Sequence, residues 1–148
     1  MFKKLNKKGF TLAELLVVVA IIGVLVAISI PIFTSQLEKA KDAVTLSNLR
    51  AAYAQAQTSY LTESNAGTDV EYTAKTASTA AKVVVKNVES KGEKAGLDNL
   101  DQMDWIPADA KTTLEGAESL GGKAQKWDVT FTYNADGKIT NVTAVAHS

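Results

Sequence analysis

The chain opens with a short basic segment, continues through a long apolar block and becomes polar after Phe33. Residues 10–33 carry one charged side chain, Glu14, and residues 15–30 are apolar or small apart from Ser29. A helix over these 24 residues would be about 36 Å long, and the hydrocarbon core of a bilayer is about 30 Å thick. The pattern therefore predicts a helix that is able to cross a membrane.

Two other structures share such an apolar pattern: a buried core helix and the hydrophobic region of a secretory signal peptide. The rest of the chain could barely surround a helix that is apolar on every side. Pro31 and Phe33 stand where a signal-peptide cleavage site would place small residues. We therefore favour a membrane helix. Four leader lysines would hold its N-terminus in the cytoplasm, with the rest of the chain outside: Lys3, Lys4, Lys7 and Lys8.

The helical pattern continues beyond Pro31, with apolar residues three or four positions apart on one face. This stripe consists of Phe33, Leu37, Ala40, Val44, Leu46, Leu49, Tyr53, Ala56 and Tyr60. A polar stretch with glycine at 63–67 predicts the end of the helix. We expect one helix over about 10–61, whose stripe is covered by the C-terminal part of the chain.

The C-terminal residues predict a β-hairpin. Apolar and polar residues alternate over 127–133, and 134–137 is a turn in which Gly137 supplies a positive φ. A second strand follows over 139–145, where the alternation slips once and predicts a β-bulge. We expect the apolar face of this hairpin to lie on the stripe of the long helix.

Between the helix and the hairpin the pattern is weaker. Residues 70–72 are a candidate edge strand, and the β-branched residues at 83–88 favour a strand, with a helix over 78–91 as the alternative. Residues 92–96 predict a turn, and Trp105 is expected to enter the core.

The expected fold class is α+β: a long N-terminal helix whose C-terminal half packs against a small antiparallel sheet. We divide the chain into a leader peptide (1–9), a hydrophobic transmembrane or filament-core helix (10–33), an amphipathic continuation (34–63) and a globular β-rich head (64–148).

The composition excludes several classes of site. There is no cysteine, and the single histidine is His147, so disulfides, thiol nucleophiles, cysteine–zinc sites and His-Glu-x-x-His metal sites are excluded. The 16 basic and 16 acidic residues give a net charge of zero, which argues against a globally basic nucleic-acid-binding protein. We expect no enzymatic activity, no cofactor and no metal.

Two further groups of charged residues are candidate binding sites, one for calcium and one for DNA. Asp98, Asp101 and Asp104 recur every three residues, and clustered carboxylates suit calcium, but without an EF-hand loop a solvated turn is favoured. Lysines that could contact DNA occur in two groups: Lys82, Lys86, Lys91 and Lys94, then Lys123 and Lys126 beside Trp127. Acidic neighbours interrupt the first group, so DNA is a disfavoured partner.

Glu14 is costly in an apolar segment, by about 1–3 kcal/mol, and such carboxylates usually have a partner. No basic side chain follows before Lys39, so the partner is either a leader lysine or a positive charge supplied in another way. The sequence Lys-Lys-Gly-Phe-Thr-Leu-Ala-Glu-Leu-Leu at 7–16, with its apolar continuation to Pro31, resembles the class III signal of type IV pilins and pseudopilins. The resemblance covers about residues 1–45.

This resemblance implies that a prepilin peptidase cuts between Gly9 and Phe10 and that the new Phe10 amine is N-methylated. The helix would wait in the cytoplasmic membrane until an assembly platform and motor packed it into the core of a homopolymeric filament. There Glu14 would pair with the Phe10 amine of a neighbouring subunit. Gly23 and Pro31 would let the intervening stretch lose helicity under load, or they are ordinary membrane-helix residues.

The expected function is that of a structural subunit of a type IV pilus, displayed on the cell surface. A pseudopilin of a type II secretion or competence DNA-uptake machine is the alternative within the same class. A bitopic membrane protein with a ligand- or DNA-binding head is the alternative from another class. The residues do not distinguish twitching motility, cell adhesion, DNA uptake and secretion as cellular roles.

Overall fold

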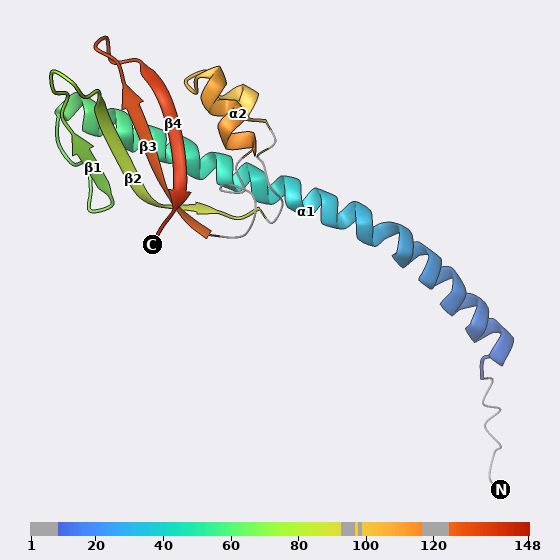
Figure 1. Ribbon diagram of the computed structural model, residues 1–148. Helices are drawn as coiled ribbons and strands as arrows, with labels where there is room; N and C mark the ends of the chain where they lie inside the picture. The colour runs from blue at the N-terminus through green and yellow to red at the C-terminus, as the bar shows by residue number, and fades with distance from the viewer. Residues whose placement is uncertain (1–8, 93–96, 98, 117–124) are drawn as a thin grey trace, which may run out of the picture. The chain divides into compact units, whose positions relative to one another are not determined.

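The computed structural model describes residues 9–92, 97, 99–116 and 125–148 (Figure 1). Two helices and four strands make up most of it, with one short 3-10 helix. In chain order they are α1 (Leu12–Thr62), β1 (Val70–Thr73), β2 (Ala81–Ser90), η1 (Leu100–Gln102), α2 (Ala108–Gly116), β3 (Gln125–Tyr133) and β4 (Ile139–Ala146). The chain forms two compact units, residues 1–36 and residues 37–148, and we call the second unit the head. The expected α+β class is confirmed.

Helix α1 ends where the sequence predicts, in a Schellman motif. The Ser64 N–H donates to the Ser59 carbonyl oxygen at 3.2 Å, and the Glu63 N–H donates to the Tyr60 carbonyl oxygen at 3.4 Å. Glu63 adopts φ 49°, the left-handed conformation that glycine usually occupies at this position. The helix therefore terminates through backbone geometry that its sequence does not favour.

The four strands form one antiparallel sheet in the order β1-β2-β3-β4. The expected edge strand, the strand at 83–88 and the hairpin are confirmed, and the alternative helix over 78–91 is wrong. Gly137 has φ 77° in the hairpin turn, as expected. The expected bulge is at Thr140, because Thr132 pairs with Asn141 and Tyr133 pairs with Ile139. The expected turn at 92–96 lies largely outside the described residues.

The core of the head lies between α1 and the inner face of the sheet. Leu49 and Ala56 of α1 are fully buried, as are the core side chains Val83, Val129, Phe131, Tyr133 and Val142 from the strands. Tyr60 stacks on Tyr133 with ring centroids 4.1 Å apart. The hairpin therefore covers the helix stripe as expected.

The first half of the expected stripe is not covered, and this part of the prediction is wrong. The exposed fractions of Leu37 and Val44 are 45% and 46%, whereas Leu46 and Leu49 are buried. Val44 and Leu46 are two positions apart, which is a rotation of about 200° around the helix. Val44 and Leu46 therefore lie on different faces, and only the second face meets the sheet.

Helix α2 was not expected from the sequence. The Lys111 N–H donates to the Pro107 carbonyl oxygen at 2.9 Å, so the helix begins directly after a proline. Its apolar face is short: Ala110 and Leu114, four residues apart, are buried. Trp105 precedes it and stacks on Tyr53 of α1 with ring centroids 4.2 Å apart. The ring is half-buried and packs against the core, so the expectation that it enters the core is met only in part.

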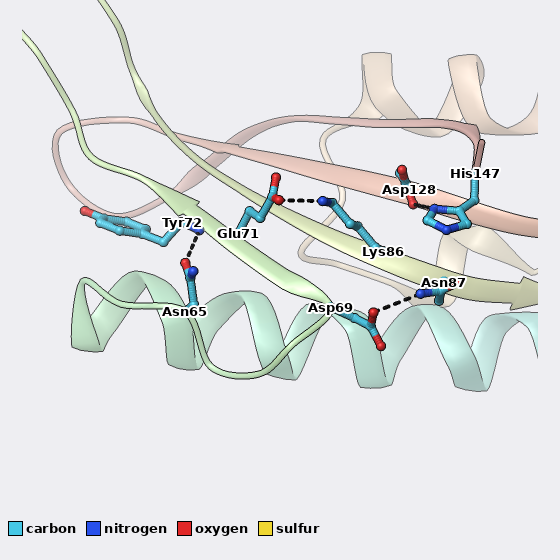
Figure 2. A network of polar contacts seen from close by, with 8 residues as sticks. All are labelled: Asn65, Asp69, Glu71, Tyr72, Lys86, Asn87, Asp128 and His147. Atoms are coloured by element: carbon cyan, nitrogen blue, oxygen red, sulfur yellow. Dashed lines mark hydrogen bonds and ion pairs between the residues drawn. The ribbon is translucent and has the colours of Figure 1, made fainter.

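Side chains close the edge of the sheet on the side of β1. The Tyr72 N–H of the edge strand donates to the Asn65 side-chain oxygen at 2.8 Å (Figure 2). Strand β2 extends beyond β1, and α1 takes the place of the missing partner strand there. The Asn48 amide donates to the Glu89 carbonyl oxygen at 2.8 Å, and the Lys91 N–H donates to the Thr45 hydroxyl at 2.9 Å. Closed edges of this kind disfavour pairing with another strand.

Candidate assembly site at the N-terminus

The first turn of α1 is closed by a capping box between Thr11 and Glu14. The Thr11 N–H donates to Glu14 Oε2 at 2.9 Å, and the Glu14 N–H donates to the Thr11 hydroxyl at 3.2 Å. This exchange satisfies two donors that a helix N-terminus otherwise leaves unpaired. Glu14 thus has a partner within its own helix, which our sequence analysis missed although Thr-x-x-Glu is a recognised signature of the motif.

The bond between Gly9 and Phe10 lies outside the helix, which begins at Leu12. Both residues are exposed, and the exposed fraction of Phe10 is 91%. A Cβ atom on Gly9 would meet no atom within 4 Å. The peptide bond at the expected cleavage position is therefore accessible and in non-helical backbone.

The N-terminal half of α1 exposes almost nothing but apolar side chains. Helix α1 contains a stretch that is long and apolar enough to cross a membrane, and none of that stretch is buried. Every described residue from Gly9 to Gln36 is exposed. Among the described residues none buries this stretch, which argues against the alternative of a buried core helix.

Helix α1 is continuous through both Gly23 and Pro31. Proline has no N–H, so the carbonyl oxygen of Ala27, four residues before it, loses its helical donor. The Ser29 hydroxyl donates to the Leu25 carbonyl oxygen at 2.7 Å, and the Thr34 hydroxyl donates to the Pro31 carbonyl oxygen at 3.0 Å. Such hydroxyl bonds compete with the backbone ladder and are common where helices bend.

The aspartates considered for calcium do not form a site in the part of the chain that is described. Asp101 and Asp104 are exposed, and Asp98 lies outside the described residues. Within those residues no three acidic or histidine side chains come together in a way that could hold a metal ion.

The lysines considered for DNA are largely engaged with carboxylates. Lys86 Nζ is paired with Glu71, which raises the pKa of Lys86 (Figure 2). Lys91 Nζ lies 2.7 Å from Glu89 and lowers the pKa of Glu89. Trp127 is buried in the core and cannot stack on a base. Lys94 and Lys123 lie outside the described residues.

Comparison with known families identifies the N-terminal segment. Residues 4–30 match the family described as the prokaryotic N-terminal methylation motif. The match contains the accessible Gly9–Phe10 bond, the capping box and most of the exposed apolar helix.

Two characterised proteins are similar to the chain. It is 45% identical over 64 residues to the type IV major pilin protein PilA of Myxococcus xanthus, a match that covers 43% of this chain and 29% of that protein. It is 47% identical over 53 residues to the type IV narrow pilus major component PilA5 of Thermus thermophilus, which covers 34% of this chain and 46% of that protein. The chain therefore matches less than half the length of either relative. No solved structure gives a significant match.

Proposed function

We propose that this chain, which belongs to the type IV pilin family by its N-terminal segment, is a structural subunit of a type IV pilus and not an enzyme. The observation that carries the proposal is the exposed apolar half of α1, which overlaps the matched motif. Such a surface needs a non-aqueous environment, and a bilayer and the core of a helical polymer each provide one. Both relatives are named as pilus components, which favours a pilin over a pseudopilin.

The precursor would lie in the cytoplasmic membrane with its lysine-rich leader inside and its head outside. A prepilin peptidase would cut the accessible bond between Gly9 and Phe10 and methylate the new amine. An assembly platform and motor would then move the helix from the bilayer into the growing filament. The apolar surface that is exposed in the single chain would be buried in both environments.

Glu14 would select the register of each incoming subunit. Its Oε2 accepts the Thr11 N–H, and its other oxygen makes no hydrogen bond with the described residues. That oxygen is available to the Phe10 ammonium of a neighbour once cleavage has created it. A charged pair with one member removed costs about 3–5 kcal/mol in an apolar core, so a misplaced subunit would be strongly disfavoured.

Intact-mass spectrometry of protein sheared from cells tests the processing step. We expect a chain that begins at Phe10 and carries one additional methyl group, in abundant sheared material. A processed chain confined to the membrane would point to a pseudopilin instead. A full-length chain that retains residues 1–9 would contradict the proposal.

A pair of substitutions separates the charge of Glu14 from its role in the capping box. Glu14→Gln keeps an oxygen that can accept the Thr11 N–H, whereas Glu14→Ala removes both functions. We expect both variants to insert into the membrane and neither to form filaments. Thr34→Ala, which removes a hydroxyl bond elsewhere on α1, serves as the matched control and should assemble normally. Normal filaments from Glu14→Gln would refute the charge pairing.

A further inference from the structure

A pocket of about 410 Å³ opens in the head between α1, the loop before β1 and the irregular part of β2. This volume lies within the range of small-molecule sites, roughly 300–1,000 Å³. Its polar walls include Asn48 and Gln55 of α1, Thr68 and Asp69 of the loop, and Asn87 of β2. The lining also contains small apolar residues: Ala51, Ala52, Val70, Val85 and Val88.

A break in the sheet creates this pocket. Strand β1 stops pairing at Val70, opposite Val85, and the register of β2 against β3 shifts between Val85 and Val88. Asn87 lies in this irregular segment with φ 59°, and its amide donates to Asp69 at 2.9 Å (Figure 2). Gly67 of the pocket lining leaves open space, because a Cβ atom on this residue would meet nothing within 4 Å. The pocket is thus held open by defined contacts.

The backbone around the pocket is not available to a pairing strand. The Lys86 N–H donates to the Asp69 carbonyl oxygen at 2.7 Å, and the Glu89 carbonyl oxygen accepts the Asn48 amide. The Lys91 N–H is taken by Thr45. A peptide that extended the sheet here would find its hydrogen-bonding partners occupied, so the groups left for a ligand are mainly side chains.

The charges of the pocket disfavour an anionic ligand. The ammonium of Lys86 is compensated by Glu71, and Glu89 is compensated by Lys91. Asp69 is bound to an amide and would repel an anion. What remains is a set of amides, a hydroxyl and one carboxylate, which together can donate to and accept from adjacent hydroxyl groups.

We propose that this pocket binds a neutral sugar ring. The hydroxyl groups of the sugar would meet Gln55, Thr68, Asp69 and Asn87, and its C–H face would cover the small apolar lining. Each hydrogen bond to a neutral group adds modestly to affinity, so we expect a weak site with a Kd of about 1 mM. This binding would give the head a function that is separate from assembly.

The test uses the full-length chain in detergent micelles, followed by NMR of its side-chain amides. The probes are the methyl glycosides of glucose, galactose, mannose and N-acetylglucosamine, each at about 10 mM, or tenfold above the expected Kd. We expect at least one to shift the Gln55 and Asn87 amide signals in a saturable manner. Gln55→Ala should weaken binding roughly three- to tenfold.

Gly67→Leu adds a bulky side chain at the pocket lining, where a Cβ atom would meet nothing within 4 Å, and should abolish binding by occupying space that the ligand needs. Ala74→Leu, at an exposed loop position outside the pocket lining, is the matched control and should bind like the unmodified chain. Unchanged signals from Trp105 and Trp127 would verify that each variant is folded; if Gly67→Leu is not, Gln55→Ala decides.

Three results would overturn the proposal: no saturable shift with any of the four glycosides, normal binding by folded Gly67→Leu, or normal binding by Gln55→Ala. Amide shifts that depend on protein concentration without sugar would indicate a second copy of the chain as the occupant and would also overturn it. Because the measurement uses unassembled chain, its failure leaves the pilin proposal intact, and a failure of filament assembly would not affect it.

Discussion

Replacing Glu63 with glycine should stabilise the head. Glu63 occupies φ 49° at the C-terminus of α1, where a non-glycine residue costs about 1–2 kcal/mol. Its negative charge also faces the negative end of the helix dipole, which costs a further 0.3–1 kcal/mol, approximately. Glycine gains more freedom than glutamate in the unfolded chain, which offsets about 0.4–1 kcal/mol. The net expectation for Glu63→Gly is a stabilisation of about 1 kcal/mol.

Thermal unfolding of the full-length chain in detergent, followed by near-ultraviolet circular dichroism of Trp105 and Trp127, measures this effect. A gain of about 1 kcal/mol corresponds to a rise in Tm of about 4 °C for a domain of this size. Glu63→Gln is the matched control, because it removes the charge and keeps the backbone strain. It should raise Tm by about 1–2 °C.

Asn87→Gly provides the contrasting case. Asn87 also has a positive φ, but asparagine tolerates this conformation better and its amide is bonded to Asp69. We expect no stabilisation there, because the lost hydrogen bond offsets the relieved strain. If Glu63→Gly leaves Tm unchanged, or if Glu63→Gln accounts for the whole rise, the argument from backbone strain is refuted.

Three further predictions concern the core and the closed edge. Burial raises the pKa of Tyr133, whose hydroxyl has no hydrogen-bond partner among the described residues. The contribution of Tyr133 to stability is therefore complete below pH 10 and is lost as pH rises above this value. Alkaline unfolding followed by circular dichroism should move to higher pH in Tyr133→Phe, and an unchanged midpoint would contradict this. Gly137→Ala should destabilise the head by about 1–2 kcal/mol, because φ is 77° and the new Cβ would lie 3.2 Å from Tyr60. Urea unfolding measures this free energy, and the control Gly67→Ala, whose Cβ lies in open space, should stay within about 0.5 kcal/mol of the unmodified chain. Equal effects of the two substitutions would argue against backbone strain at Gly137. Asn48→Ala should lower the free energy of unfolding by about 1 kcal/mol in the same assay, because it removes the hydrogen bond to the Glu89 carbonyl oxygen. It should also speed hydrogen exchange of the β2 backbone amides, and unaltered exchange would show that this hydrogen bond does not protect the edge of the sheet.

The sequence determined those features that depend on neighbouring residues. The apolar block at 10–33 required a helix with a non-aqueous environment whatever the rest of the chain did. The alternation at 127–133, the turn at 134–137 and a slip in the alternation within 139–145 predicted a bulged hairpin. The pairing of Thr11 with Glu14 was also readable from the Thr-x-x-Glu spacing, because a capping box involves residues only three apart.

Only the tertiary structure decided which residues meet across long separations in the chain. Val44 and Leu46 each belong to a series of apolar residues at helical spacing, so the sequence does not show which of them is buried. Contact with the sheet determined that Leu46 is buried and Val44 is exposed. In the sequence Thr45 and Asn48 are ordinary helix residues. Their role as hydrogen-bonding partners of the chain at Glu89 and Lys91 arises only because β2 extends beyond β1 in the folded sheet. The sugar pocket likewise depends on Asp69 meeting Asn87, residues whose proximity follows from sheet register. Local sequence patterns specify individual helices, strands and turns, because the interactions behind these patterns lie within one or two turns or strands. The packing of the core and the lining of a binding site depend on contacts between segments distant in the chain, which local patterns do not encode.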